Sequence, residues 1–411
     1  MKTKIQIGNK NISGSLSLSG SKSISNRLLI LQALSGQMSP LKNLSNSDDT
    51  LVLQKALSSS SSTIDVGIAG TAMRFLTSYS TIQDSEIILT GAHRMKERPI
   101  KDLVDALRVL GAEITYLENE DFPPMRINGK NLKGGALSIN ADISSQFISA
   151  LLMVAPYFEK GIQLELVGEV LSRPYIEMTL NLMQRQGVSH RWEGNTISIS
   201  PGVYQNIIKE VESDWSSISY WFEIIALSDS GEIQISQVDE NSVQGDQKVM
   251  DFFQSLGVSS RIDKGVLSLA KKTNFKLPEY IEFDCVETPD LAQTLAATAC
   301  GLGLNMMLTG LKNLPLKETN RLVALKVELE KCGAAIKIIN NEALEIISGE
   351  RFSSKDFNFE TYGDHRMALC LAPLALKAKS VIVDDAEVIN KSYKSYWEDL
   401  KRLSFDIHLF K

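Results

Sequence analysis

Hydrophobic and polar residues follow one pattern that recurs along the whole chain. One half of the repeated unit is an amphipathic helix that ends at a glycine and is followed by an alternating strand. The copies span residues 99–116, 174–192, 247–262, 320–338 and 396–409. Gly111, Gly187, Gly257 and Gly333 close the first four predicted helices, whereas Ser404 closes the last. Glycine readily adopts the left-handed conformation of a helix end, so this spacing predicts where these helices stop.

The other half of the repeat is a more apolar helix that opens with small or hydroxyl-bearing residues. These helices are predicted to begin near Ser21, Gly70, Ser144, Asp214, Thr288 and Asp364. Because they are apolar on most sides, we expect them to be buried. Short alternating segments between the helices, such as residues 87–90 and 233–236, predict strands.

The repeat predicts the fold class. Cycles that mix strands with buried and amphipathic helices indicate an α/β protein of repeated subdomains, because they are too long and too mixed for a short-repeat solenoid. Six cycles, three in each half, predict two similar lobes with a boundary near residues 211–214. The first cycle is shorter than the others.

Composition and charge narrow the classes of function. Of the 411 residues, 43% are hydrophobic and 22% are charged, which is the usual globular range. The net charge of −6 argues against bulk electrostatic binding of nucleic acid or anionic lipid. No uninterrupted apolar stretch approaches the ~18 residues of a membrane span, and no secretory signal opens the chain. Four widely spaced cysteines without a CxxC motif indicate neither a zinc site nor a disulfide framework, and they favour a cytoplasmic location.

Cations gather at the starts of the predicted buried helices and in the adjoining loops. Helix N-termini attract anions through free N–H groups, and added Lys and Arg side chains make phosphate or carboxylate pockets. Any one of these cations alone is also explained as a solvated surface charge. As a set they would neutralise two trianionic substrates, which at ~6 Å repel by about 6 kcal/mol even in water. The set is Lys22, Arg27, Arg74, Arg94, Lys96, Arg98, Lys317, Arg321, His365, Arg366 and Lys391.

Carboxylates beside these cations are candidates for acid/base chemistry. Glu318 directly follows Lys317, and a structural ion pair is the alternative interpretation. Asp290 and Asp364 open predicted helices, so each is also a candidate N-cap. Asp48 and Asp49 are interpreted as helix capping only. The sequence shows no P-loop, no GxSxG motif and no metal-ligand spacing, so we expect neither a metal nor a cofactor.

Ordered motifs give the chain a resemblance to a known family. The motifs are Gly20-Ser-Lys-Ser-Ile-Ser-Asn-Arg27, Ala69-Gly-Thr-Ala-Met-Arg74, Leu89-Thr-Gly91 with Arg94-Met-Lys-Glu-Arg-Pro99, Ser144-Ser-Gln146, Lys317-Glu-Thr319 and Asp364-His-Arg-Met367. Together they resemble 5-enolpyruvylshikimate-3-phosphate (EPSP) synthases across essentially the whole chain. Any one motif is modestly specific, but the ordered set is highly specific.

The resemblance implies a fold and an activity. The fold would be a two-lobed inside-out α/β barrel of six βαβαββ-type subdomains, three per lobe, with helices buried and sheets outside. Residues 1–20 and 214–411 would form one lobe and residues 21–213 the other, with the active site in the cleft between the lobes. The activity would be transfer of the enolpyruvyl group of phosphoenolpyruvate to the 5-hydroxyl of shikimate 3-phosphate, releasing phosphate. These small molecules would be its partners, and we expect a monomer.

The same resemblance implies roles for individual residues. Asp290 and Glu318 would be the acid/base pair, with Lys22 assisting on the phosphate side, and Arg74 and Arg98 would support the loops. Shikimate 3-phosphate would be bound by Lys22, Ser23, Arg27, Ser144, Ser145, Gln146, Ser172, Tyr175, Asp290, Asn313 and Lys317. Phosphoenolpyruvate would be bound by Lys22, Gly70, Arg94, Gln146, Arg321, Arg366 and Lys391.

Two positions depart from the family pattern. Ile68 stands where Asn is common, and Phe75 stands where Pro is common. Because both lie beside the expected phosphoenolpyruvate site, we predict altered affinity for phosphoenolpyruvate and for the family inhibitor glyphosate. Unchanged inhibition on Ile68→Asn and Phe75→Pro would remove this hypothesis.

Two other functions explain part of the pattern. An enolpyruvyl transferase acting on UDP-N-acetylglucosamine would share the fold, but it usually carries an early Lys-Asn pair and a reactive Cys. Here the early pair is Lys22-Ser23, and residues 91–99 contain no Cys. A non-catalytic anion- or RNA-binding repeat protein would explain the cations but not Glu318 and Asp290 beside them.

Overall fold

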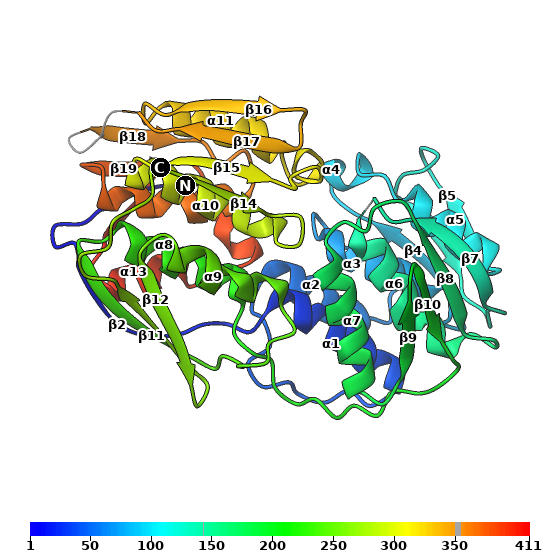
Figure 1. The fold of residues 1–411 in the computed structure, drawn as a ribbon. Helices are drawn as coiled ribbons and strands as arrows, with labels where there is room; N and C mark the ends of the chain where they lie inside the picture. Colours follow the sequence, from blue (N-terminus) through cyan, green and yellow to red (C-terminus); the bar gives the residue numbers. More distant parts are fainter. Residues whose placement is uncertain (143, 350–354) are drawn as a thin grey trace. The chain divides into compact units, whose positions relative to one another are not determined.

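The computed structural model describes residues 1–142, 144–349 and 355–411. The chain divides into two compact units (Figure 1). The split unit consists of Met1–Ser19 and Glu212–Lys411, and the continuous unit of Gly20–Val211. The sequence-based domains begin at residues 21 and 214, whereas the compact units change over at Gly20 and Glu212.

In the part of the split unit that the structure describes, the strands form three four-stranded sheets. Their strands, in sheet order, are β18 (Asp356–Phe359), β19 (Ser380–Val383), β1 (Lys2–Gln6) and β20 (Asp406–Phe410); β14 (Tyr280–Asp284), β15 (Asn305–Thr309), β17 (Ala343–Ile347) and β16 (Ala335–Ile339); and β12 (Val258–Asp263), β13 (Val266–Lys271), β11 (Ser230–Ser236) and β2 (Asn11–Ser17). The strands β1 and β2 complete two of these sheets, so the first 19 residues belong to this unit.

The described residues of the continuous unit form two sheets of the same design. They are β3 (Thr63–Asp65), β4 (Glu86–Thr90), β6 (Met125–Asn128) and β5 (Glu113–Tyr116), and β7 (Gly135–Asn140), β8 (Ile162–Val167), β10 (Thr196–Ile199) and β9 (His190–Glu193). In all five sheets one parallel pair is followed by two antiparallel neighbours. This shared order is the structural form of the repeat seen in the sequence.

The more apolar helices form the interior of each unit, as the sequence predicts. They are α1 (Lys22–Ser35), α3 (Gly70–Ser80) and α6 (Ser145–Val154) in the continuous unit, and α8 (Trp215–Leu227), α10 (Ala292–Leu302) and α12 (His365–Leu371) in the split unit. Ser21, Ser144, Asp214 and Asp364 each accept a backbone N–H in the first turn of the helix that follows. Side-chain caps of this kind satisfy N–H groups that a helix leaves free, which explains these starting points.

The amphipathic helices and the short elements complete the two units. They are α2 (Asp48–Leu57), α4 (His93–Lys96), α5 (Lys101–Val109), η1 (Ala155–Tyr157) and α7 (Arg173–Arg185), then η2 (Gly245–Lys248), α9 (Val249–Gln254), η3 (Pro289–Leu291), η4 (Leu314–Leu316), α11 (Arg321–Glu330), η5 (Ala372–Leu376), η6 (Val388–Lys391) and α13 (Tyr396–Arg402). Gly111, Gly187, Gly257 and Gly333 all have positive φ, and Ser404 has φ +69°. The predicted left-handed helix ends are therefore confirmed.

Two copies of the repeat differ from the sequence pattern. The first cycle, which is also the shortest, contains α1, α2 and one parallel bridge between Lys42 and Glu210, and the described residues form no four-stranded sheet there. The helix predicted from residue 247 is a 3₁₀ turn, η2, followed by the short helix α9.

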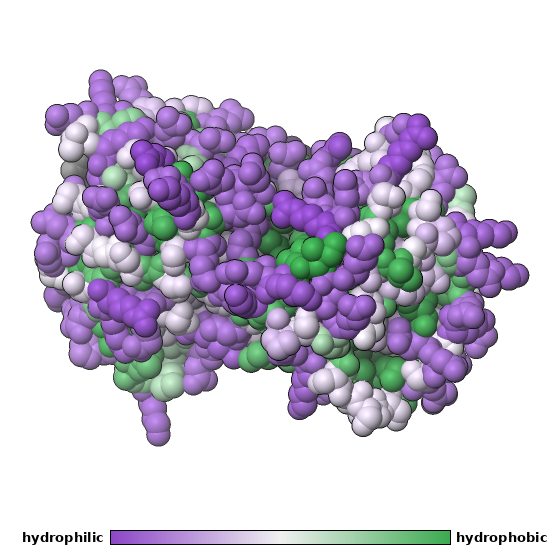
Figure 2. All heavy atoms as spheres, turned by 90° about the horizontal axis from the view of Figure 1, so that it is seen from below, coloured by the Kyte–Doolittle hydropathy of each residue, from purple (hydrophilic) through white to green (hydrophobic). Residues whose placement is uncertain are grey.

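The face drawn in Figure 2 is mainly polar. On the face shown in Figure 2, hydrophilic residues predominate and hydrophobic residues lie in patches between them. In the described part of the chain, every helix is too short or too polar to cross a membrane.

Candidate active site

Lys22 opens α1 and is balanced by a carboxylate from the next helix. Its Nζ lies 3.4 Å from Asp49 Oδ2, and the Asp49 side chain is only 5% exposed. The cap of α2 is Ser47, whose hydroxyl accepts the N–H of Thr50. The interpretation of Asp49 as a capping residue only is therefore wrong, because Asp49 compensates the charge of a predicted substrate-binding lysine.

Arg27 is a buried side chain that connects three helices of the continuous unit. Its Nε donates to Thr179 Oγ1 at 2.7 Å, its Nη1 to the Ser23 carbonyl at 2.9 Å, and its Nη2 to Ser149 Oγ at 3.1 Å and the Tyr175 carbonyl at 3.2 Å. Burial lowers the pKa of Arg27 to about 10, so the guanidinium stays charged at neutral pH. It thus joins α1 to α6 and α7 and fixes the backbone of two predicted contact residues, Ser23 and Tyr175.

Gly70 begins α3 against two arginines. Arg74 Nη1 donates to the Gly70 carbonyl at 3.3 Å, and Arg74 Nη2 donates to the Pro99 carbonyl at 3.4 Å. A Cβ at residue 70 would lie 2.6 Å from Arg98 Nη1, so a side chain there would displace the end of the Arg98 side chain. The supporting roles of Arg74 and Arg98 stay predictions.

The two departures from the family pattern lie close to this helix start. Ile68 is 51% exposed, two residues before α3. Phe75 is buried inside α3, and the guanidinium carbon of Arg27 lies 5.5 Å from its ring centroid. The predicted change in glyphosate affinity stays a prediction.

Arg94 is an exposed cation on the short helix α4. Its side chain is 59% exposed, and Nη1 lies 2.8 Å from Glu97 Oε2. The hydrogen bond from Arg94 lowers the pKa of Glu97. Because exposed ion pairs contribute little stability, an arriving anion can replace Glu97 at Arg94.

The remaining candidate residues of the continuous unit lie at two helix starts. Ser144 caps α6 by accepting the N–H of Gln146 at 3.3 Å, and Ser145 is the first residue of that helix. Gln146 Nε2 donates to Thr71 Oγ1 at 3.2 Å, which links α6 to α3. Ser172, with φ +54°, precedes α7, which carries Tyr175 in its first turn.

In the split unit, one buried arginine binds three carboxylates. Arg321 Nε lies 2.7 Å from Asp364 Oδ2, Nη1 lies 3.0 Å from Asp290 Oδ1, and Nη2 lies 3.0 Å from Glu318 Oε2. The Arg321 side chain is 2% exposed. Burial acts to lower the pKa of Arg321, but the charges of Asp364, Glu318 and Asp290 outweigh it and raise the pKa, so this guanidinium is permanently charged.

Three more cations surround the predicted acid/base pair. Arg366 Nη2 lies 2.8 Å from Asp290 Oδ2, Lys391 Nζ lies 3.0 Å from Glu318 Oε1, and Lys317 Nζ lies 4.0 Å from Asp290 Oδ1. Burial lowers the pKa of Lys317, although the charge of Asp290 opposes the shift. We call Asp290, Lys317, Glu318, Arg321, Asp364, Arg366 and Lys391 the Arg321 cluster. Asn313 lies four residues before Lys317, at the start of η4.

The structure shows which of these carboxylates cap helices and which form ion pairs. Asp364 is the N-cap of α12, accepting the Arg366 N–H at 2.9 Å, and it also binds Arg321. Asp290 is not an N-cap, because Thr288 holds that position and Asp290 lies within η3. Glu318 does form ion pairs, with Arg321 and Lys391.

Sequence reasoning missed a connected pair, Asp246 and Ser216. Asp246 is buried and its Oδ2 accepts the Ser216 hydroxyl, while Ser216 Oγ accepts a hydrogen bond from Arg366 Nη2 at 3.3 Å. The only signal in the sequence was a Gly-Asp pair just before a predicted amphipathic helix, and such a pair is ordinary in turns.

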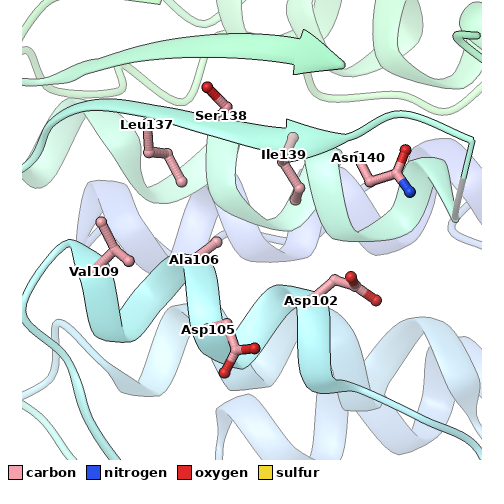
Figure 3. A pocket seen from close by; sticks show the side chains of 8 residues that line it. All are labelled: Asp102, Asp105, Ala106, Val109, Leu137, Ser138, Ile139 and Asn140. Carbon is pink, nitrogen blue, oxygen red and sulfur yellow. The ribbon is translucent and has the colours of Figure 1, made fainter. Parts of the chain in front are cut away.

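Elsewhere in the continuous unit, a hollow of about 320 Å³ lies between α5 and β7. In Figure 3, Leu137 and Ile139 point from β7 toward α5, which carries Asp102 and Asp105. This hollow contains none of the predicted site residues. Within residues 1–142, 144–349 and 355–411, no group of three or more His, Cys, Asp or Glu side chains is placed to hold a metal ion.

Comparison with known proteins then decides the family. A family model described as EPSP synthase (3-phosphoshikimate 1-carboxyvinyltransferase) matches residues 7–59 and 53–400. The chain belongs to the EPSP synthase family. A 3-phosphoshikimate 1-carboxyvinyltransferase of Bacteroides fragilis (strain YCH46) is 43% identical over 398 residues, covering 96% of each chain. One of Haemophilus influenzae (strain PittGG) is 36% identical, covering 95% of this chain and 96% of the relative.

Solved structures give the same result for the fold. An EPSP synthase from Acinetobacter baumannii matches with a TM-score of 0.77 at 20% identity, covering 99% of this chain and 100% of that chain. The comparisons confirm the predicted EPSP synthase family, the α/β fold class and the enzyme class. Family membership argues against both alternatives, the UDP-N-acetylglucosamine enzyme and the non-catalytic repeat protein.

Proposed function

We propose that this chain transfers the enolpyruvyl group of phosphoenolpyruvate to the 5-hydroxyl of shikimate 3-phosphate, in the shikimate pathway of aromatic amino acid biosynthesis. Family membership and the names of its relatives support the reaction. The observation that carries the assignment of residues is that Asp290 and Glu318 both lie 3.0 Å from one buried guanidinium, that of Arg321. This places two carboxylates at fixed positions among cations.

The reaction requires proton transfer in two steps that run in opposite directions. The methylene carbon of phosphoenolpyruvate gains a proton, and the 5-hydroxyl oxygen bonds to the neighbouring carbon as its own proton leaves. The tetrahedral adduct then loses a methyl proton while its carbon–oxygen bond to phosphate breaks. We assign the proton transfers to Asp290 and Glu318. General acid/base groups of this kind contribute about 10²–10⁴-fold to the rate.

The cations have a second task, which is to neutralise the two substrates. Arg321, Arg366 and Lys391 of the split unit and Lys22, Gly70, Arg94 and Gln146 of the continuous unit are assigned to phosphoenolpyruvate. Lys22, Ser23, Arg27, Ser144, Ser145, Gln146, Ser172, Tyr175, Asp290, Asn313 and Lys317 are assigned to shikimate 3-phosphate. Fixed charges stabilise a developing charge better than water does, because they do not reorganise during the reaction.

Lys22 is assigned to the binding of both substrates. In catalysis it is assigned to the phosphate group that leaves. Its Nζ is held by Asp49 at 3.4 Å, so the ammonium is already oriented before an anion arrives. Lys22 would then stabilise the departing phosphate as its bond to carbon breaks.

Other expectations stay predictions. They are a monomeric state, a cytoplasmic location, an active site in a cleft between the lobes, and a reaction without metal or cofactor. Gel filtration of the purified chain tests the first, and full activity after treatment with a strong chelator tests the last.

The test of the proposed function is phosphate release. We expect release only when shikimate 3-phosphate and phosphoenolpyruvate are both present, with EPSP as the second product by mass spectrometry. Release with UDP-N-acetylglucosamine in place of shikimate 3-phosphate would support the alternative transferase. If phosphate were released with neither acceptor, the proposal would be contradicted.

Glu318→Gln tests the assigned chemistry. We expect kcat to fall by about 10²–10⁴-fold with little change in either KM, because the amide keeps the shape but cannot carry the proton. Glu342→Gln, an exposed site in the same unit, is the matched control and should leave kcat unchanged. A change confined to KM would reject an acid/base role for Glu318.

A further inference from the structure

Asp246 is connected to the proposed active site through a single hydroxyl group. It lies in η2 with 5% of its surface exposed, and its Oδ2 accepts a hydrogen bond from Ser216 Oγ. Ser216, in the first turn of α8, in turn accepts from Arg366 Nη2 at 3.3 Å. The same arginine nitrogen lies 2.8 Å from Asp290 Oδ2. Asp246, Ser216, Arg366 and Asp290 therefore form a continuous chain of contacts.

Other side chains already attach this loop to the start of α8. Gln244 Oε1 accepts the Trp215 N–H at 3.1 Å, and Gln244 Nε2 donates to the Ser213 carbonyl at 3.0 Å. Ser242 Oγ donates to Glu212 Oε1 at 2.8 Å. Burying a carboxylate costs free energy. Because Gln244 and Ser242 already attach this segment to the start of α8, Asp246 is not needed as an anchor. Its remaining contact partner is the hydroxyl that touches Arg366.

The charge of Asp246 is poorly compensated. Among the residues that the structure describes, no Lys or Arg forms an ion pair with its carboxylate at 4.0 Å or less, and Arg366 pairs with Asp290 instead. Burial, with repulsion from Asp290 added, raises the pKa of Asp246 to about 7, while Arg366 and the Ser216 hydrogen bond act in the opposite direction. The charged or titratable groups that face it from neighbouring elements are Asp290, Arg366, Asp214 and Cys285. Both protonation states are thus populated at neutral pH.

We propose that Asp246 is a positioning residue that acts through Ser216 on Arg366 and thereby sets how strongly Arg366 binds an anionic group of phosphoenolpyruvate. The inference rests on the proposed function. When Asp246 is protonated, Asp290 is the acidic group next to Arg366, and the guanidinium keeps most of its attraction for a substrate. When Asp246 is ionised, a second negative charge lies one hydroxyl away, and attraction for the substrate falls.

The experiment compares the wild-type enzyme, Asp246→Asn and the control Asp251→Asn between pH 6 and pH 8. Asp251 is exposed on α9, so its amide variant carries the same chemical change away from the cluster. The phosphate of phosphoenolpyruvate itself titrates near pH 6, so the measure is the ratio of wild-type to variant KM at each pH. We expect this ratio to rise about five-fold over the range for Asp246→Asn and to stay flat for Asp251→Asn.

Three further readouts separate positioning from a general structural defect. The ratio of wild-type to variant KM for shikimate 3-phosphate should be the same at all pH values. Ser216→Ala should raise KM for phosphoenolpyruvate, and Ser216→Thr, which keeps a hydroxyl, should restore it. Infrared difference spectra of the substrate-free enzyme should show a protonated carboxyl band that disappears near pH 7 in the wild type and in Asp251→Asn but is absent in Asp246→Asn.

The outcomes that overturn the inference are distinct from failure of the proposed function. A flat KM ratio for Asp246→Asn, or equal effects on both substrates, would overturn it. If Asp246→Asn does not fold, the wild-type infrared titration and the two Ser216 variants still decide, and absence of the band or an unchanged KM in Ser216→Ala would overturn it. A wild-type enzyme that converts neither substrate would instead refute the proposed function.

Discussion

The two units hold their candidate residues in opposite ways. In the split unit, four cations and three carboxylates bind one another, and Arg321 at their centre is 2% exposed. In the continuous unit, Arg27 is held by hydroxyl and carbonyl oxygens, and the side chain of Arg94 is 59% exposed beside Glu97. The split unit has its charges fixed before any substrate arrives, whereas the continuous unit keeps cations that can exchange partners.

This difference indicates a division of labour. Acid/base groups must be held within a fraction of an ångström, and a saturated ion-pair network provides that rigidity. An anion binds readily to a cation that can exchange a weakly held partner for it. Breaking an exposed ion pair costs little free energy. Changes in the split unit should therefore affect both stability and kcat, and changes in the continuous unit should chiefly affect KM.

Removing the shared guanidinium should break this pattern most strongly. In Arg321→Met we expect kcat to fall by about 10²–10³-fold, because Asp290 and Glu318 lose their common partner. The free energy of unfolding should fall by about 3–5 kcal/mol, because buried carboxylates are left uncompensated. Steady-state kinetics and chemical denaturation measure the two effects. Arg261→Met, at a side chain that is 78% exposed, is the control.

Retained stability in Arg321→Met would contradict the view of the Arg321 cluster as a single electrostatic unit. A fall in stability without a fall in kcat would separate the structural role of Arg321 from any role in positioning Asp290 and Glu318.

Removing an exposed cation in the continuous unit should affect only binding. Arg94→Ala should raise KM for phosphoenolpyruvate by about 10–100-fold, the value of one charge-assisted hydrogen bond. The free energy of unfolding should change by less than about 0.5 kcal/mol, because the pair with Glu97 is exposed. Lys101→Ala, which removes an exposed, ion-paired lysine of the same unit that is outside the cation set, should leave KM unchanged. An unchanged KM in Arg94→Ala would remove Arg94 from the site.

A buried carboxylate that is not a member of the Arg321 cluster adds a comparison through pH. Glu223 is fully buried in α8, and neither of its oxygens has a hydrogen-bond partner in the described part of the chain. Burial raises the pKa of Glu223 well above the ordinary value, so the folded state retains a proton that the unfolded state loses. Stability from this group is therefore present at low pH and declines as pH rises above the unfolded pKa of about 4.3.

Glu223→Gln removes this titration. Relative to the wild type, its free energy of unfolding should rise with pH by up to about 1.4 kcal/mol per pH unit between the unfolded and folded pKa values. Denaturant unfolding at several pH values measures it, with the exposed Glu232→Gln as control. A difference that is independent of pH would show that Glu223 is ionised in the folded protein.

The smallest effect concerns the helix ends that both units share. Ser404, with φ +69°, takes the conformation that glycine takes at Gly111, Gly187, Gly257 and Gly333. Ser404→Gly should stabilise the protein by about 1 kcal/mol, because a side chain is strained in the left-handed region. Gly111→Ser should cost a similar amount, since a Cβ there meets no neighbouring atom within 4 Å and only the backbone strain remains. Thermal denaturation measures both variants, and the two changes in stability must have opposite signs.

The helices and most of their end points follow from local features of the chain. Ser21, Asp214 and Asp364 cap helices with their own side chains, and the glycines that end helices need only their own backbone freedom. Such effects act within a few residues, so they are readable without a structure. The same holds for the EPSP synthase resemblance, because its motifs are contiguous.

The partnerships of the charged groups are not local. Asp290, Glu318 and Asp364 come from three separate segments of the chain and meet at Arg321 only after the split unit folds. Lys22 and Asp49, or Asp246 and Ser216, are likewise joined by the packing of different helices. Because a charge acts through space and through the exclusion of water, its partner and its pKa depend on distance and burial in the folded chain, which the order of residues does not specify.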